Sequence, residues 1–209
     1  MSYTREYWRD RYASRTDLST SVIHLTRGTP NNKVYEVLFK ILSEEQIKGS
    51  TTKTGHIVGK NKAVCFQDIP MTSVGQNCHF EKKLRKQNSS TKSKIRYLPC
   101  GICFDKSFVY KKGGRPVIYE ETSIAKEMLD EEEWWRIVNF NLSNKNAIID
   151  WTHEREWRVK GDFRFKRKNA TLILSGKNGY KNFMKYCEDQ ESSIYQEVAG
   201  IVTLANVLF

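Results

Sequence analysis

Residues 150–159 read Asp-Trp-Thr-His-Glu-Arg-Glu-Trp-Arg-Val and form the densest mixture of acidic, basic and aromatic side chains in the 209-residue sequence. The alternation after Glu154 predicts a strand over residues 156–164, with Trp157 and Val159 facing the core. Side chains two residues apart on a strand project from the same face, about 7 Å from one another. We therefore expect the carboxylates of Glu154 and Glu156 to lie together at the beginning of this strand.

Further strands are predicted on both sides of this stretch. Alternating or β-branched residues predict strands at 21–26, 62–67, 95–104, 115–119, 171–174 and 198–209. Lys111-Lys-Gly-Gly114 is expected to join the strands 95–104 and 115–119 as a hairpin turn, although the same segment can also be compared with a phosphate-binding loop.

Helices are predicted between these strands. Apolar spacing predicts helices over residues 34–42, 122–139 and 182–187, and a basic helix from Cys78 that becomes a loop by Lys94. Core contacts in the second of these are expected from Ile124, Met128, Trp135 and Val138. Because strands outnumber helices and are scattered between them, the predicted fold class is α+β with a mixed, largely antiparallel sheet.

One domain over residues 1–209 accommodates these elements. We expect it to carry an N-terminal extension (1–20), a basic helix and loop (78–96) and an acidic helical insertion (120–140). With 35 Lys+Arg against 24 Asp+Glu, the formal charge is +11. Such a surface predicts an anionic partner, most often a nucleic acid.

The charges are unevenly distributed along the chain. Residues 81–96 and 160–168 are strongly basic, whereas residues 120–133 are acidic. A groove for phosphates would form if the loop around Lys92 and the strand around Arg164 converged, with the acids on another face. The alternative is that each run is an ordinary solvated face.

Cysteine usage and hydropathy predict where the protein resides. The five cysteines are an odd number at irregular spacing, which favours reduced thiols. The sequence has no apolar stretch of about 18 residues and begins with a polar segment, so we expect a soluble, cytoplasmic protein without membrane contact.

A metal site is weakly indicated. Cys100-Gly-Ile-Cys103 has zinc-knuckle spacing, with Cys78 and His79 upstream. On a strand, however, Cys100 and Cys103 would face opposite sides, and no second pair completes four ligands, so no metal is expected. Cys65 and Cys103 are instead expected to be small buried side chains.

Two segments suggest chemistry. One carboxylate of the Glu154/Glu156 pair can hold a sugar hydroxyl or stabilise a developing cation, while the other deprotonates a nucleophile. The alternative is a surface ladder of charged strand residues. His24 lies in an apolar strand, where a hydrogen-bonded core histidine is the alternative to a site residue, but the polar turn that includes Arg27 follows it and could hold a phosphate.

The order of these segments resembles the ADP-ribosyltransferase superfamily, in particular its compact prokaryotic branch of DarT-type toxins and AbiGi-type abortive-infection proteins. The resemblance covers roughly residues 21 to 175 and rests on short motifs in a fixed order. They are His24-x-Thr-Arg27, Ala63-Val-Cys-Phe-Gln-Asp-Ile-Pro70, Tyr97-Leu-Pro-Cys-Gly-Ile-Cys-Phe104, Arg115-Pro-Val-Ile-Tyr119 and Glu154-Arg-Glu-Trp-Arg158.

The resemblance implies a compact, split mixed or antiparallel sheet that binds NAD+, as a co-substrate, in an extended cleft. It implies that Glu156 is the catalytic glutamate, that Glu154 is the first acid of a Glu-x-Glu signature, and that His24 contacts the nicotinamide ribose. The other implied residues are Thr26, Arg27, Phe66 and Tyr97 for NAD+, and Trp151 and His153 for the acceptor; Arg164 is a further acceptor candidate because it belongs to the basic run 160–168.

The function implied in this way is an NAD+-dependent ADP-ribosyltransferase toxin that modifies RNA or DNA in bacterial antiphage defence or a toxin–antitoxin system, with an antitoxin or chaperone as a further partner. Two alternatives remain open from the residues. One is a metal-dependent nuclease built from Asp150, Glu154 and Glu156. The other is a non-catalytic nucleic-acid-binding module.

Overall fold

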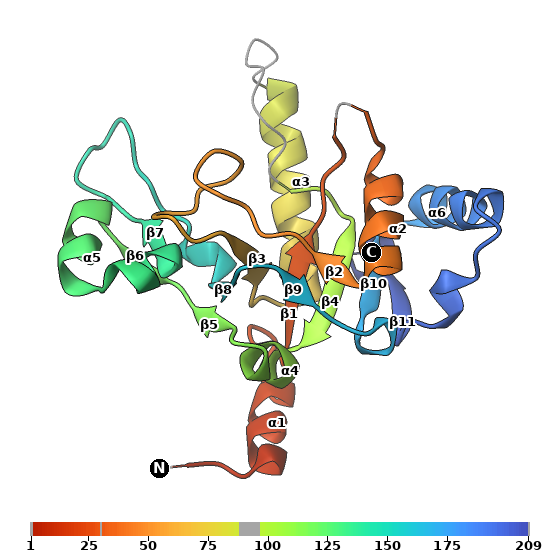
Figure 1. Ribbon diagram of the computed structural model, residues 1–209, viewed down its shortest axis with the longest axis horizontal. Helices are drawn as coiled ribbons and strands as arrows, with labels where there is room; N and C mark the ends of the chain where they lie inside the picture. The colour runs from red at the N-terminus through yellow and green to blue at the C-terminus, as the bar shows by residue number, and fades with distance from the viewer. Residues whose placement is uncertain (1, 30, 88–96, 209) are drawn as a thin grey trace.

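The computed structural model describes residues 2–29, 31–87 and 97–208. The largest sheet of the protein has seven strands (Figure 1). Its strand order is β11-β10-β4-β1-β3-β8-β5, and only β10 and β11 within it run parallel. The bounds in that order are Gly200–Thr203, Thr171–Leu174, Gly101–Asp105, Ser21–Leu25, Ala63–Gln67, Glu156–Lys160 and Arg115–Pro116. The predicted α+β class with a mixed, largely antiparallel sheet is confirmed.

Two small sheets flank the main one. An antiparallel pair joins β2 (Gln46–Ile47) to β9 (Phe163–Arg164), and a parallel pair joins β6 (Ile118–Glu120) to β7 (Ile137–Asn139). Four short 3₁₀ helices connect larger elements: η1 (Glu131–Arg136), η2 (Thr152–Glu154), η3 (Arg167–Asn169) and η4 (Ile194–Gln196).

Helices cover both faces of the half-sheet β11-β10-β4-β1. The helix α2 (Val34–Glu44) packs against α6 (Lys177–Asp189) on one face, and α3 (Met71–Gln87) packs against α7 (Ala205–Leu208) on the other. Alternation along the strands explains the two layers, since Val22 belongs to the core beneath α2 and α6 whereas Ile23 belongs to the core beneath α3. The remaining helices are α1 (Arg5–Ala13), α4 (Lys106–Lys111) and α5 (Thr122–Met128).

Phenylalanines fill the larger core. Phe163 makes edge-to-face contacts with Phe66 and Phe104, with ring centroids 5.2 and 5.1 Å away, and Phe104 contacts Phe165 at 5.0 Å. Such edge-to-face pairs add stabilisation beyond the area they bury. Because these rings come from β3, β4 and the segment around β9, the cluster links the centre of the sheet to its flanking pair.

The sheet opens between its two central strands. β1 and β4 share five register pairs, and so do β3 and β8, but β1 and β3 share only the pair Ile23–Gln67. The two halves of the sheet are therefore held together where the end of β3 meets the middle of β1, and they separate beyond it. This opening positions the site described below.

The structure confirms the predicted strands at 21–26, 62–67 and 171–174 and the helix at 34–42, each within two residues at its ends. The helix predicted at 182–187 is longer, because α6 begins at Lys177 and ends at Asp189. The helix predicted from Cys78 begins earlier, at Met71 directly after Pro70, and its predicted loop at 88–96 lies outside the described residues.

The predicted hairpin between residues 95–104 and 115–119 is wrong. Asp105 accepts a hydrogen bond from the Phe108 backbone N–H and begins the helix α4, so the chain leaves the sheet instead of turning back. The strand β4 pairs with β1 and β10, while β5 pairs with β8. Gly113, with φ of +91°, follows the end of α4, which is the usual place for a glycine in the left-handed region.

Four predicted elements are shorter than expected. The helix 122–139 divides into α5, η1 and β7, with Trp135 and Val138 buried as predicted but Ile124 and Met128 exposed. The strand 156–164 breaks at Gly161, where φ is +81°, and the strand 198–209 ends at Thr203 before α7. Of the strand predicted over 95–104, residues 95–96 lie outside the described residues and β4 begins at Gly101.

We predict that Phe163→Ala lowers the free energy of unfolding by about 3–5 kcal/mol, because it leaves a cavity among four other aromatic rings. Urea denaturation followed by tryptophan fluorescence measures the change. Phe80→Ala is the matched control, since Phe80 is 59% exposed on α3 and its removal should cost less than about 1 kcal/mol. Equal losses for both variants would show that the phenylalanine cluster is not the centre of the core.

Candidate functional site

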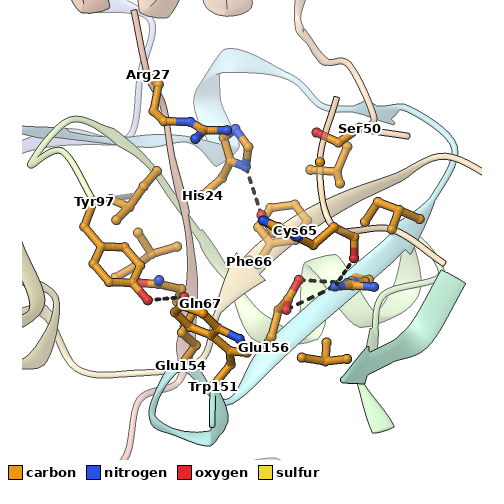
Figure 2. A pocket seen from close by; sticks show the side chains of 18 of the residues that line it. His24, Arg27, Ser50, Cys65, Phe66, Gln67, Tyr97, Trp151, Glu154 and Glu156 are labelled. Carbon is orange, nitrogen blue, oxygen red and sulfur yellow. Dashed lines mark hydrogen bonds and ion pairs between the residues drawn. The ribbon is translucent and has the colours of Figure 1, made fainter. Parts of the chain in front are cut away.

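A cavity of about 550 Å³ lies where the sheet opens between β1 and β3 (Figure 2). Its walls come from β1, β3, the beginning of β8, the segment 48–57 and α3. This volume falls within the range of small-molecule sites. The cavity contains charged groups with buried side chains, which is uncommon unless those groups have partners or a function.

Glu154 and Glu156 both line this cavity, but not for the reason expected from strand spacing. Glu154 ends η2 and only Glu156 belongs to β8, so the two carboxylates do not share a strand face. Arg155 between them has φ of +45° and ψ of +52°, in the left-handed region. This turn directs both carboxylates into the cavity, and the surface-ladder alternative is wrong because Glu156 is only 6% exposed.

The Arg155 side chain stabilises this turn. Its Nε donates to the Asp68 carbonyl over 2.7 Å and its terminal nitrogen donates to the Asp17 carbonyl over 2.6 Å. In return, the Asp68 backbone N–H donates to the carbonyls of Glu154 and Arg155. These bonds connect the turn to the end of β3 and to the N-terminal segment.

Glu156 forms a buried ion pair with Arg158, two residues further along β8. Arg158 Nε donates to Glu156 Oε1 over 2.8 Å, and a second guanidinium nitrogen approaches Oε2 at 3.3 Å. Arg158 also donates to the carbonyls of Trp135 and Ile137. Burial alone would lower the pKa of Arg158, but the adjacent Glu156 charge raises it overall, so the guanidinium remains charged.

Glu154 has a different environment. Burial and the nearby Glu156 charge raise the pKa of Glu154 to about 7, against the opposing effect of a hydrogen bond from the Tyr97 hydroxyl. The nearby Gln67 side chain also opposes the rise in the pKa of Glu154. Glu156 is therefore held in an ion pair, whereas Glu154, with a pKa of about 7, can exchange a proton at neutral pH, so the two carboxyl groups suit different roles.

His24 lies in β1, on the side of the cavity opposite Glu154 and Glu156 (Figure 2). Its Nδ1 is 2.9 Å from the Cys65 carbonyl oxygen, which can only accept, so Nδ1 carries the proton. Burial, together with the Arg27 charge, lowers the pKa of His24 and keeps the ring neutral. The neutral ring then has Nε2 as a hydrogen-bond acceptor.

The structure brings most of the other predicted site residues together. Arg27, Phe66, Tyr97 and Trp151 line the cavity with the two glutamates and His24. His153 lies beside it, with Nε2 3.1 Å from the Tyr97 hydroxyl oxygen.

Two predicted site residues lie elsewhere. Thr26 directly follows β1 and is buried, and among the described residues it is not part of the cavity lining. Arg164 is exposed on β9, whose partner is β2, and it is also outside the cavity. The predicted convergence of the Lys92 loop with the strand around Arg164 involves a loop that lies outside the described residues.

Sequence reasoning missed several groups that face the cavity. Arg158 could have been found, because it stands two residues after Glu156 on a strand and therefore shares its face. Gln67 ends β3 opposite Glu156, a pairing that no local pattern announces. Lys48, Ser50 and Arg85 reach the cavity from a loop and a helix far away in the sequence, and the rest of the lining from the same segments is Gly55, His56, Ile57, Glu81 and Leu84.

The charged runs are less segregated than predicted. Lys160 pairs with Glu132 of the acidic segment at 2.6 Å, and this contact, together with Lys60, lowers the pKa of Glu132 to about 2. Lys166 pairs with Glu45 and Arg167 with Glu197. The basic run 160–168 is therefore partly neutralised by acids from other elements.

The positions of the cysteine, histidine and acidic side chains bear on whether the protein could hold a metal ion. In the described ranges, no group of three or more His, Cys, Asp or Glu residues is placed to hold a metal ion. Cys100 and Cys103 belong to different core layers, on opposite faces as predicted, and Cys103 is buried whereas Cys65 is half-buried at the cavity. No helix within the described part of the chain is long and apolar enough to cross a membrane.

No protein-family model, curated protein or solved structure matches the chain. The fold and the geometry of the cavity therefore carry the functional argument.

We predict that Glu154→Gln stabilises the protein in a pH-dependent manner. The native state holds the Glu154 proton more tightly than the unfolded chain does, so the wild type loses stability as pH rises from about 4.5 to about 7. Glutamine cannot ionise but can still accept from Tyr97. The variant should match the wild type at pH 4.5 and exceed it by about 2–3 kcal/mol at pH 8, measured by urea denaturation. The exposed Glu188→Gln is the control, and the same pH-independent offset in both variants would contradict the prediction.

We predict that Arg158→Met lowers the free energy of unfolding by about 3–5 kcal/mol, because it leaves the Glu156 charge buried without its partner. The double variant Arg158→Met/Glu156→Gln should recover about 1–3 kcal/mol of this loss, as measured in a double-mutant cycle. The recovery is partial because the bonds from Arg158 to two backbone carbonyls remain absent. Strict additivity of the two substitutions would argue against the ion pair.

Proposed function

We propose that this chain is an NAD+-dependent ADP-ribosyltransferase that attaches ADP-ribose to a nucleic acid, with a role as a toxin in bacterial antiphage defence. The observation that carries the proposal is the pair Glu154/Glu156: both side chains line one cavity at the opening of the sheet, but Glu156 is paired with Arg158 whereas Glu154 has a pKa raised to about 7. The separation of β1 from β3 also supports it, because the resembling superfamily binds NAD+ in a cleft of a split sheet.

Glu156 is the group suited to stabilise positive charge. Its pairing with Arg158 allows a carboxylate to persist at a site that is almost fully buried. A fixed negative charge in a water-poor cavity stabilises the cation that develops at the ribose C1′ more strongly than the same charge in water. The adjacent carboxylate oxygens can also accept a hydrogen bond from a ribose hydroxyl.

Glu154 is the group suited to remove a proton. With a pKa of about 7, it is an effective general base near neutral pH. In the overall transfer, the bond between C1′ and the nicotinamide nitrogen breaks with its electrons leaving on nicotinamide, which departs neutral. The acceptor nucleophile forms the new bond to C1′, and its proton passes to Glu154.

The rest of the lining suits a dinucleotide. The positive groups Arg27, Lys48 and Arg85 can neutralise a diphosphate, and His24 Nε2 can accept from a ribose hydroxyl. Trp151 offers an aromatic surface beside Glu154, on which a base of a single-stranded nucleic acid could stack. The net charge of +11 favours such an acceptor through phosphate contacts.

Labelled NAD+ tests this proposal. Purified protein is incubated with biotinylated NAD+ and with cellular RNA, DNA or protein in parallel. We expect label on the RNA or the DNA, and we expect Glu156→Gln to lower the rate by roughly 10²–10³-fold, as for the loss of one strong electrostatic group in other enzymes. Glu188→Gln, an exposed glutamate on α6, is the control and should retain full labelling.

Each other outcome has a defined meaning. Label on protein alone would reject the nucleic-acid acceptor while retaining the transferase. Equal labelling by wild type and Glu156→Gln would reject the catalytic role of Glu156. Cleavage of nucleic acid without NAD+, abolished by EDTA, would favour the metal-dependent nuclease. Binding of nucleic acid that is unchanged in Glu156→Gln, with no reaction of any kind, would favour the binding module.

A further inference from the structure

Gln67 occupies a central position in the cavity. It is the last residue of β3, it pairs with Ile23 at the one point where β1 and β3 still meet, and it lies opposite Glu156 on β8. Its side chain lines the cavity between the two halves of the sheet and is 7% exposed (Figure 2). A polar side chain with so little exposure is expected to have all its hydrogen bonds made within the protein.

One polar atom of this amide lacks a partner. The amide lies near Glu154, because the Gln67 side chain opposes the rise in the pKa of that carboxyl group. The amide oxygen Oε1 is buried, and within the described part of the chain it has no hydrogen-bond partner. A buried acceptor without a donor is unfavourable, and a ligand that supplies an N–H group would remove this cost.

The position of Glu156 indicates which ligand group this is. Directly opposite residues of antiparallel strands have Cβ atoms about 5 Å apart, so Gln67 and Glu156 are neighbours. In the proposed function, Glu156 lies at the bond between ribose and nicotinamide. The nicotinamide ring is then adjacent to Gln67, and its neutral carboxamide carries the N–H donors.

We propose that Gln67 Oε1 accepts a hydrogen bond from the carboxamide N–H of the nicotinamide group, and that Gln67 thereby makes the cavity selective for a carboxamide. This inference rests on the proposed function and names a specificity-determining residue within it. Because Oε1 is buried without a partner in the described part of the chain before any ligand binds, its preference for an N–H donor is a property of the free protein.

Matched dinucleotides test the inference by binding. Titration calorimetry compares NAD+ with its 3-acetylpyridine analogue, which keeps the carbonyl but has a methyl group in place of the amide NH₂. The wild type should bind NAD+ roughly 10- to 100-fold more tightly, since the analogue leaves Oε1 unpaired. In Gln67→Met, which has similar length and no amide, the two dissociation constants should agree within about threefold.

Controls separate the amide from general effects. Gln196→Met makes the same chemical change on η4, where the side chain is exposed, and should keep the wild-type ratio. Circular dichroism checks that Gln67→Met is folded, and Gln67→Leu is the second variant. The ratio of two ligands measured on one variant is insensitive to a change in the fraction of folded protein.

The outcomes distinguish this inference from the function beneath it. Selectivity in the wild type and its loss in Gln67→Met support the carboxamide contact. Binding of NAD+ without selectivity, or with selectivity retained in both Gln67 variants, overturns the role of Gln67 but leaves the transferase proposal standing. The hypoxanthine analogue of NAD+ differs from NAD+ at the adenine base. If the wild type discriminates against this analogue and Gln67→Met does not, Gln67 contacts the adenine end and the inference is wrong. Absence of binding by any dinucleotide overturns the proposed function and this inference together.

Discussion

The buried ion pair between Glu156 and Arg158 is the interaction on which the geometry of the site depends. Burying a carboxylate is costly unless it has a partner, and the contact with the Arg158 guanidinium supplies that partner. Arg158 also donates to the carbonyls of Trp135 and Ile137, so the pair attaches β8 to η1 and β7. The acidic segment 120–140 thus stabilises the ion pair through these two backbone carbonyls.

The opening of the sheet follows from how few bonds join β1 to β3. Each half of the sheet is fully paired within itself, but between the halves only Ile23 and Gln67 are in register. Beyond that point, the His24 ring donates to the Cys65 carbonyl and takes the place of a ladder hydrogen bond. A side chain therefore satisfies a backbone acceptor exactly where the strands part, and the space between them becomes the cavity.

Much of the fold could be predicted from sequence because it depends on local patterns. The strands β1, β3 and β10 and the helix α2 have clear apolar periodicity, and they were located to within two residues. The helix α4 was missed because its signal is a single capping residue, Asp105, at the end of an apolar strand. The predicted core roles of Ile124 and Met128 are wrong because the helix is only the short α5, whose buried residue is Ala125, and both side chains are exposed.

The site was predicted in part and for a partly wrong reason. The motif Glu154-Arg-Glu156 identified both carboxylates, but strand spacing does not unite them; the left-handed backbone of Arg155 does. Such a conformation is costly for an arginine and is not visible in composition or periodicity. Gln67 and Lys48 could not have been found at all, because strand register and loop packing bring them to the cavity from distant parts of the chain.

The N-terminal extension gives this turn its final support. The Arg155 guanidinium bridges the carbonyls of Asp17 and Asp68, so residues before β1 hold the backbone between the two carboxylates. Lys106 pairs with the Asp68 side chain at 2.6 Å and lies 4.5 Å from the centre of the Tyr12 ring of α1. Although α1 buries none of its own residues, the segment that follows it is part of the framework of the site. The left-handed conformation of Arg155 is thus maintained by contacts from two separate segments, at Asp17 and Asp68, which offset its intrinsic cost and leave Glu154 and Glu156 directed into one cavity.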